Sequence, residues 1–330
     1  MLQNKDLAVV ILNWNGKALL EQFLPSVIKY SDDAVIYVAD NNSTDDSVAF
    51  VTKQFPAVKI IQNSENGGYA KGYNDALKQI TEPLLCLLNS DIEVTENWLQ
   101  PIISEFNKDA KTAIIQPKIL DYKNKSYFEY AGAAGGYIDK LGYPYCRGRI
   151  FDTIEEDKNQ YNDTTTIFWA SGACLFIRNS VFKELDGFDE SYFAHVEEID
   201  LCWRAFNKSY KTKYVGASTI YHVGGATLSN TNPKKTYLNF RNSLFTLVKN
   251  TDSNLVLKIL SRMLLDGVAA IRFLFQLKPL FLVAILKAHI SFYFNLPHLL
   301  KQRKQLSQRS NYYECNSIVW SYFIKKRTQF

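Results

Sequence analysis

The chain has 330 residues, of which 47% are hydrophobic and 22% charged, and its net charge is +5. This size and balance are typical of a globular protein with one large domain, or one domain and a smaller addition, and they exclude a disordered chain. The small net charge does not favour a nucleic-acid partner. Five cysteines are scattered without a CxxC pair, which argues against a zinc site or disulfide framework and favours a reducing compartment. Because residues 1–6 lack the features of a signal peptide, we expect a cytoplasmic protein.

Strand and helix patterns alternate through the first third of the chain. Strands are expected at 7–12, 35–39, 58–61 and 84–88, and helices at 17–30, 43–54, 69–78 and 97–107. Such alternation predicts a mostly parallel sheet with helices on both faces, which is an α/β fold.

The middle of the chain is richer in Gly, Tyr and Thr. Short strands are expected at 113–115, 173–177, 212–215 and 218–222, a loop at 152–166 and a helix at 196–207. From residue 233 to the end the pattern is helical, with long apolar stripes and scattered basic residues.

The most apolar part of this helical region is 280–300. It includes Lys287, Asn295 and Pro297, which argues against a plain transmembrane helix. Two interpretations stay open. The stretch forms a helical subdomain or a homodimer face, or it lies on an anionic membrane, which the basic residues at 301–304 would favour.

Polar residues follow the buried strand at 84–88. The apolar run stops at Asn89-Ser90-Asp91. Ligands of open α/β sheets bind outside the carboxyl ends of such strands, so Asp91 is a candidate ligand for a metal bound to a phosphorylated substrate. The plainer interpretation of Asp91 is a turn residue.

The ends of the first two strands carry a second candidate site. The sequence Asn13-Trp14-Asn15-Gly16 is not GxGxxG, so a dinucleotide cofactor is not supported. Asp40 ends the second strand and can accept a hydrogen bond from a nucleobase ring N–H, as uracil and thymine offer. Turn chemistry before the next helix is the alternative.

A glycine-rich segment opens the third helix. Gly67 and Gly68 allow close approach of a backbone or a ligand, and Lys71 can supply charge to a phosphate. Asn74 and Asp75, one turn further on, are placed to face the same cleft.

Acidic residues gather at the start of the helix expected at 196–207. Glu197, Asp200 and Arg204 share a face, and Glu198 points about 100° away. One interpretation is that these acids stabilise the helix N-terminus and that Asp200 pairs with Arg204. The other is that one of them is a general base.

His222 follows the last expected strand. A lone His there is more often structural, but a divalent ion near Asp91 would gain from a second protein ligand. Imidazole with carboxylate suits Mn²⁺ somewhat better than Mg²⁺.

Seven ordered motifs together resemble the family 2 glycosyltransferases with a GT-A fold, in the branch of bacterial rhamnosyltransferases and other polysaccharide-building enzymes. The motifs are VVILNWNG, DNNSTDDS, NGGYAKGYN, LLNSD, ASGACLFIRNSVFKELDGFDESYF, VEEIDLCWR and YHVGG, within residues 7 to 250. The resemblance implies a Rossmann-like nucleotide-sugar-binding and catalytic domain at 1–230, with a nucleotide half to about residue 112 and an acceptor half from 113, and a helical region at 231–330.

The resemblance also implies roles for individual residues. Asp91 would be the metal ligand of the family's Asp-x-Asp motif, although Asn89 replaces its first Asp, and His222 would complete the metal shell. Glu198 would be the catalytic base, with Glu in place of Asp, beside Glu197 and Asp200. Trp169, Ser171 and Trp203 would contact the acceptor. The implied donor-binding residues are Asn13, Asn15, Asp40, Asn42, Asn66, Gly68, Lys71, Asn74, Asp75, Asn89, Ser90 and Gly172.

The activity implied is an inverting transfer of a sugar from a nucleoside diphosphate donor, dTDP- or UDP-linked, to a hydroxyl of a glycan or lipid-linked glycan. A divalent metal, Mn²⁺ or Mg²⁺, would take part. A sugar-1-phosphate nucleotidyltransferase would need a Gly-rich phosphate loop after the first strand, which 13–16 does not offer. A membrane-associated scaffold that keeps the fold without turnover is the other alternative, and Asn89 favours it.

Overall fold

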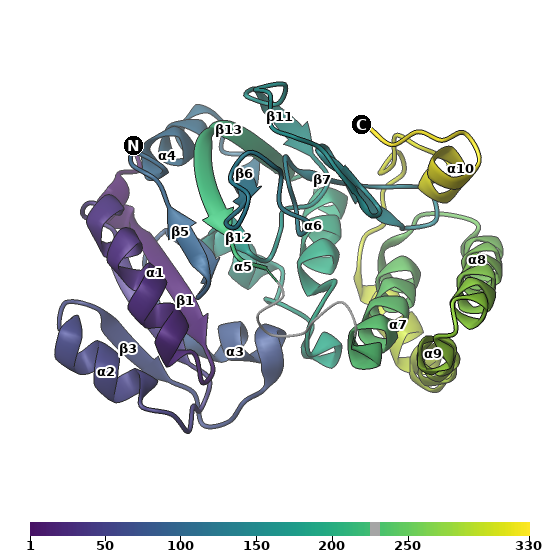
Figure 1. The fold of residues 1–330 in the computed structure, drawn as a ribbon, viewed down its shortest axis with the longest axis horizontal. Helices are drawn as coiled ribbons and strands as arrows, with labels where there is room; N and C mark the ends of the chain where they lie inside the picture. The colour runs from purple at the N-terminus through teal and green to yellow at the C-terminus, as the bar shows by residue number, and fades with distance from the viewer. Residues whose placement is uncertain (225–231) are drawn as a thin grey trace.

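A nine-stranded mixed sheet runs through the middle of the molecule (Figure 1). The structure is a computed structural model that describes residues 1–224 and 232–330. The strand order is β11-β13-β6-β12-β4-β1-β2-β3, with β5 paired to β13. The strands are β1 (Leu7–Asn13), β2 (Val35–Asp40), β3 (Lys59–Gln62), β4 (Leu84–Asn89), β5 (Ile92–Val94), β6 (Thr112–Asp121), β11 (Thr164–Ile167), β12 (Cys174–Arg178) and β13 (Lys211–His222).

A second, smaller sheet and ten α-helices complete the described part of the chain. The small sheet holds β7 (Gly136–Ile138), β8 (Pro144–Cys146), β9 (Arg149–Ile150) and β10 (Thr153–Ile154). The helices are α1 (Lys17–Tyr30), α2 (Ser47–Gln54), α3 (Gly68–Leu77), α4 (Leu99–Lys108), α5 (Asn179–Glu184), α6 (Glu197–Asn207), α7 (Pro233–Asn250), α8 (Leu255–Phe275), α9 (Pro279–Gln305) and α10 (Ile318–Phe323). Short 3₁₀ turns lie at Asn4–Asp6 and Glu190–Tyr192.

The expected α/β fold is confirmed. Strands β3, β2, β1 and β4 pair in parallel, whereas β12 runs antiparallel to both β4 and β6. The strands are apolar on both faces because each face is covered. In β1, Val9 and Ile11 pack with α1, α2 and α4, and Ala8 and Val10 pack with α3, α5 and α6 (Figure 1).

Several element boundaries differ from the sequence prediction. Helix α2 begins at Ser47 instead of residue 43, because the backbone N–H groups of Ser43 and Thr44 are bonded to Asp40 and Asn15. The strands expected at 212–215 and 218–222 form one strand, β13, with a register shift against β6. The loop expected at 152–166 contains β10 and the start of β11.

The C-terminal helices form a layer at one end of the molecule (Figure 1). Helix α7 packs on α6, α9 packs on α7, and α8 packs on α9. Leu244, Phe245 and Leu247 of α7 belong to the same hydrophobic core as α3 and α6. The boundary predicted at residue 230, and Gly225 of the YHVGG motif, fall in 225–231, outside the described residues.

Candidate active site

The carboxyl ends of the parallel strands bring Asn13, Asp40 and Asn89 to one edge of the sheet. Asn13 on β1 pairs with Asp40 on β2, and Asn89 on β4 pairs with Leu12 on β1. The Asp40 carboxylate is buried and accepts bonds from Asn13 Nδ2 at 3.0 Å and from the Ser43 N–H at 2.9 Å. Asn13 therefore orients Asp40 at the expected nucleotide edge.

Asp91 and His222 face each other across the end of the sheet. His222 Nε2 lies 3.2 Å from Asp91 Oδ1, and its Nδ1 lies 3.3 Å from Glu129 Oε2. All three side chains are buried. Burial alone would lower the pKa of His222, but its contacts with Asp91 and Glu129 outweigh burial and raise it to about 10. The site therefore favours a positive charge on or beside the imidazole.

The donor set at Asp91 and His222 fits a divalent ion. Adjacent ligands at about 2.1 Å from an octahedral ion lie about 3 Å apart, close to the separation of these two atoms. Glu129 on the far ring nitrogen is the partner that metal-bound histidines usually have. Within the described residues, no group of three or more His, Cys, Asp and Glu side chains could hold a metal. The remaining ligands would have to be water and substrate oxygens.

Glu197 and Glu198 begin α6, as the sequence predicts. Glu197 is buried and Glu198 half-buried. Burial, and next the Glu198 carboxylate, raise the pKa of Glu197 well above its usual range. Desolvation by the surrounding protein raises the pKa of Glu198 to about 7. Glu198 is therefore the acid of this pair that is more accessible and closer to the ionisation a general base needs.

One short segment connects the acidic pair to the metal-ligand pair. A methyl group placed on Gly172 would lie 3.8 Å from Glu198 Cδ and 3.0 Å from the Tyr69 hydroxyl. The next residue, Ala173, accepts a bond from the Asn89 N–H at 3.0 Å. Asn89 Nδ2 lies 3.4 Å from His222 Nε2. The structure thus brings Glu198, Gly172, Asn89 and His222 into one neighbourhood.

The loop before Glu197 has an unusual backbone. Phe193, His195 and Val196 all have positive φ angles, and Val196 is β-branched at φ 75°. Such conformations persist only where the surroundings hold them. The Asn242 side chain on α7 donates to the carbonyls of Tyr192, Ala194 and His195 at 3.2, 3.0 and 2.7 Å. Asn242 therefore fixes the loop that positions Glu198.

Several predicted donor-binding residues instead hold the protein's own loops. Gly68 has φ 80°, and a side chain there would meet the Phe193 carbonyl at 2.4 Å, so its role is backbone approach. Asn74 exchanges bonds with Phe188 and lines a groove with Phe188 and Glu190. Asp75 is paired with Lys71 and Lys78.

The loops around Asp40 use more of these side chains. Asn15 Oδ1 accepts from the N–H groups of Thr44 and Asp45, and Asn66 Oδ1 accepts from Asn41 and the Gly68 N–H. Asn42 is exposed with φ 61°. Ser90 is half-buried and lies close to Gly16. Donor contact by these residues stays a prediction.

The three residues predicted to contact the acceptor have buried side chains. Trp203 is fully buried, with its ring 4.6 Å from that of Tyr312. Trp169 donates its indole N–H to the Tyr137 carbonyl at 2.9 Å, and Ser171 is bonded to Ala131. Within residues 169–173 only Gly172 is partly exposed, and acceptor contact by Trp169, Ser171 and Trp203 stays a prediction.

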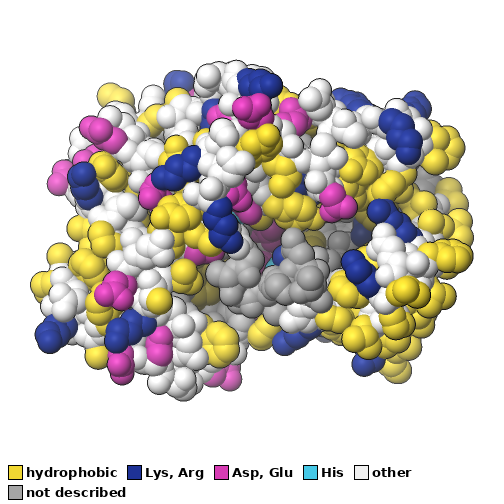
Figure 2. Space-filling model, viewed as in Figure 1, with side chains coloured by type: hydrophobic (Ala, Val, Ile, Leu, Met, Phe, Trp, Pro, Cys, Tyr) yellow, Lys and Arg dark blue, Asp and Glu magenta, His cyan; other side chains and the backbone are white. Residues whose placement is uncertain are grey.

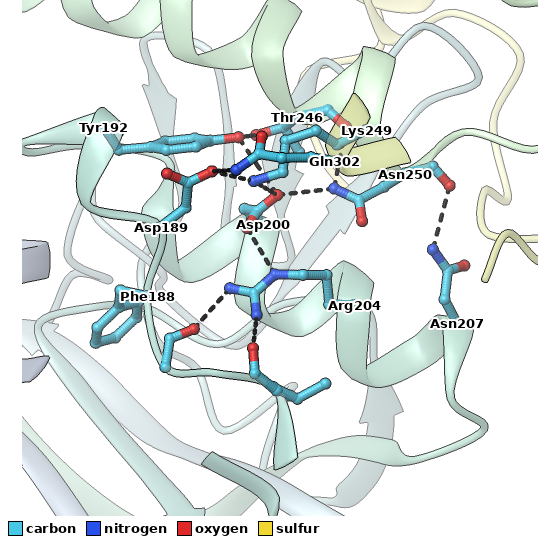
Figure 3. Close-up of polar contacts among 12 residues, drawn as sticks. Phe188, Asp189, Tyr192, Asp200, Arg204, Asn207, Thr246, Lys249, Asn250 and Gln302 are labelled. Carbon is cyan, nitrogen blue, oxygen red and sulfur yellow. Dashed lines mark hydrogen bonds and ion pairs between the residues drawn. The ribbon is translucent and has the colours of Figure 1, made fainter. Parts of the chain in front are cut away.

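Asp200 is fully buried inside an ion-pair network, which favours the ion-pair interpretation of this acid (Figure 3). Its carboxylate lies 2.8 Å from Arg204 Nε and 2.9 Å from Lys249 Nζ, and accepts from Asn250 Nδ2 at 2.8 Å. Burial alone would raise the pKa of Asp200, but Lys249 and Arg204 lower it. Asp200 ties α6 to α7 and is a structural residue.

Replacing Asp200 by Asn is expected to destabilise the fold by about 3–5 kcal/mol, because the buried Arg204 loses its counter-charge and Lys249 keeps only Asp189. Urea unfolding followed by circular dichroism would measure it. Asp46→Asn is the matched control, since Asp46 is 82% exposed in its pair with Lys17 and should leave the midpoint unchanged. Equal midpoints for both variants would contradict the structural role.

Sequence reasoning missed Glu129, Tyr69 and Asn242. Glu129 is 93 positions from His222, and its only signal is an acid inside an apolar and aromatic segment. The Tyr69 hydroxyl donates to the Gly172 carbonyl at 2.8 Å, a contact over 103 positions. Asn242 lies in a helix that gave no sign of contact with the acidic pair.

Comparisons with known proteins identify the family of this chain. The family model described as Glycosyl transferase family 2 matches residues 8–186, more than half of the chain. An N-acetylglucosaminyl-diphospho-decaprenol L-rhamnosyltransferase of Mycobacterium tuberculosis is 24% identical over 232 residues, which cover 66% of this chain and 75% of the relative. A low-salt glycan biosynthesis hexosyltransferase of Haloferax volcanii is 23% identical over 205 residues, 61% of each chain.

Solved structures share the fold at low sequence identity. The structure of GalNAc-T7 with UDP, GalNAc and Mn²⁺ has a TM-score of 0.59 and 18% identity. The match covers 74% of this chain and 48% of the GalNAc-T7 chain. S. aureus TarS with UDP-GlcNAc has a TM-score of 0.55 and 15% identity over 91% of each chain. The fold is therefore GT-A, and the match of the family model shows that this chain belongs to glycosyltransferase family 2.

Proposed function

We propose that the protein is an inverting hexosyltransferase that moves a sugar from a dTDP- or UDP-linked donor to a hydroxyl of a glycan or lipid-linked glycan. The observation that carries the proposal is the placement of Glu198. Its half-buried carboxylate lies beside Gly172, and the following residue bonds Asn89 next to the Asp91–His222 pair. These contacts support a proposed base and a proposed diphosphate-binding region that are linked by one short segment.

In the proposed reaction Glu198 takes the proton of the acceptor hydroxyl. The hydroxyl oxygen forms a bond to the anomeric carbon as the bond from that carbon to the diphosphate breaks, and the electron pair leaves with the diphosphate. One such displacement inverts the anomeric configuration. A divalent ion held by Asp91 and His222 would offset the negative charge of the leaving diphosphate. Burial and the neighbouring Glu198 carboxylate raise the pKa of Glu197 well above its usual range, so we propose Glu198 and not Glu197 as the base.

The donor base is proposed to bind at Asp40. Each Asp40 oxygen already accepts one bond, from Asn13 and from the Ser43 N–H, and each keeps a lone pair for a ring N–H. Uracil and thymine both offer that group, so we propose uridine and thymidine donors alike. Structures solved with UDP or UDP-GlcNAc in the same fold support a nucleotide-sugar donor.

The biological setting is proposed from the mycobacterial relative, whose name gives a diphospho-decaprenol acceptor. We propose a comparable lipid-linked or glycan acceptor, a bacterial cell-envelope polysaccharide as the product, and a cytoplasmic location. We also propose a catalytic unit at 1–230, with halves at 1–112 and 113–230, and a helical region at 231–330.

A donor screen tests this proposal at the binding step. Donors that bind the folded protein should raise its unfolding temperature, and more so with Mn²⁺. We expect stabilisation by dTDP- or UDP-sugars and none by adenosine diphosphate sugars, which lack the ring N–H. Stabilisation by adenosine donors in wild type and in Asp40→Asn alike would contradict base recognition by Asp40.

A scaffold without turnover is the second candidate, favoured by Asn89 in place of the family's Asp. Such a scaffold would bind the donor but release no nucleoside diphosphate when acceptor is added. We expect release that depends on acceptor.

Asn242→Ala is expected to lower kcat about a hundredfold with little change in donor affinity, because a small shift of the loop misplaces Glu198. Steady-state kinetics and donor calorimetry would measure the two effects. Asn239→Ala, on the same helix, is the matched control and should keep kcat. A large rise in KM at constant kcat would contradict a positioning role.

A further inference from the structure

Helix α8 exposes its apolar residues and buries its charges. Lys258, Arg262 and Asp266 lie inward and are at most 5% exposed. The outward face carries Leu257, Leu260, Leu264, Val268, Ile271 and Phe275, each at least 54% exposed. These positions recur every three or four residues, so they form one stripe along the helix. A helix facing water on that side would have the opposite pattern.

The inward charges hold α8 in this orientation. Asp266 accepts from the Tyr143 hydroxyl at 2.7 Å and from Arg262 Nε at 3.0 Å. Lys258 Nζ donates to Thr251 Oγ1 at 2.7 Å. Rotating the helix to hide its apolar stripe would break the bond from Tyr143 to Asp266 and the bond from Arg262 to the Leu141 carbonyl, and would leave buried polar groups without partners. The contacts of the inward side chains therefore fix the apolar stripe on the outer face of α8.

Helix α9 continues the apolar surface. Val283, Leu286, Ile290 and Phe294 are exposed at helical spacing, and Leu277, between the two helices, is 89% exposed. Figure 2 shows hydrophobic side chains gathered over the end of the molecule that holds α8 and α9, with basic side chains among them. A contiguous patch of this kind marks an interaction surface.

Helices α8 and α9 are placed to lie along a membrane surface and not to cross the membrane. By length and composition α9 is the one helix in the described ranges that could span a membrane. However, its inner residues Ala288, Phe292 and Leu299 are buried against the protein, and Arg303 donates to the carbonyls of Val248 and Thr251. These contacts keep α9 alongside α7.

The basic charge of the C-terminal region favours an anionic partner for this face. Residues 255–330 contain twelve Lys and Arg against two Asp and Glu, so the rest of the chain is net acidic. Arg272, Lys278, Lys287 and Lys301 are exposed on α8, α9 and their connection. A second copy would bring a like-charged surface against this one, whereas an anionic bilayer offers the opposite charge and an apolar interior.

We propose that the α8–α9 face docks on the surface of an anionic lipid bilayer, with the apolar stripe inserted at the headgroup boundary and the basic side chains on the lipid phosphates. The proposal does not rest on the catalytic role, because lipid binding is measured without donor or acceptor.

Co-sedimentation of the full chain with vesicles tests it. Wild type should sediment with vesicles of phosphatidylglycerol and phosphatidylcholine, and far less with phosphatidylcholine alone. Leu264→Gln with Ile290→Gln should weaken binding at least about tenfold at constant charge. Lys278→Gln with Lys287→Gln should weaken binding to anionic vesicles about 30-fold. Ile154→Gln, an exposed apolar residue elsewhere, is the matched control and should bind as wild type.

Circular dichroism and thermal unfolding establish that each variant is folded, and light scattering without lipid gives the oligomeric state. Point variants are used because removing α9 would strip Phe292 and Leu299 from the core. Unchanged sedimentation of the Leu264 and Ile290 variant would overturn the proposal. A wild-type dimer that ignores vesicles and dissociates in that variant would overturn it too, and would assign the face to a second copy.

Discussion

Glu198→Gln is expected to lower the rate of sugar transfer about a thousandfold, because the amide cannot take the acceptor proton. Donor affinity should change little, since we propose that the donor base binds at Asp40 and that Glu198 acts on the acceptor hydroxyl. Release of nucleoside diphosphate and calorimetric donor binding would measure the two quantities. Glu197→Gln is the internal control, because Glu197 is the adjacent acid and is buried, and burial raises its pKa well above the usual range.

The pH dependence provides an independent test of the same residue. A general base acts only when deprotonated, and burial raises the pKa of Glu198 to about 7. We therefore expect kcat/KM to rise with pH, to be lost below about pH 6 and to level off above about pH 8. If Glu197→Gln were the inactive variant and Glu198→Gln kept this profile, the base would be Glu197.

Asp91→Ala is expected to lower metal-dependent transfer about a thousandfold, because the leaving diphosphate loses the cation that offsets its charge. His222 would remain, but a neutral imidazole alone is a weak site for Mn²⁺ or Mg²⁺. Initial rates over a Mn²⁺ titration would measure the loss. Asp46→Ala, far more exposed, is the matched control for removal of a carboxylate.

Glu129 extends this prediction beyond the two ligands. Its carboxylate faces His222 Nδ1 at 3.3 Å, and partners of this kind affect metal affinity 10–100-fold. We expect Glu129→Gln to weaken Mn²⁺ activation within about that range and to keep the maximal rate. An unchanged Mn²⁺ requirement in Asp91→Ala would remove Asp91 from the metal site.

The local sequence predicted the nucleotide half well, because its elements are set by local patterns. Helix α1 has the expected bounds, and the strands at β1, β2 and β4 are runs apolar on both faces. Asp40, Asp91 and Glu198 end up where strand ends and a helix start place them. The short strands β7 to β10 were not predicted, since two or three residues carry no period.

The roles of the remaining residues depend on contacts between distant positions. Asn74 accepts a hydrogen bond from the Phe188 N–H, 114 positions away, and Asp200 accepts one from Asn250, 50 positions away. The resemblance predicts acceptor contact for Trp203, whereas in the fold its ring packs against those of Phe168 and Tyr312. The outward direction of the apolar stripe on α8 could not be predicted from the sequence either. Periodicity predicts that a stripe exists but not whether it faces the core or the solvent.

The central claim is a single displacement of a nucleoside diphosphate by an acceptor hydroxyl that Glu198 activates. Proton NMR of the product from a dTDP- or UDP-sugar with Mn²⁺, run on wild type and Glu198→Gln, tests it most directly. We predict one nucleoside diphosphate per glycoside, an anomeric configuration opposite to that of the donor, and almost no product from the variant. Retained configuration, or wild-type yield from Glu198→Gln, would contradict it.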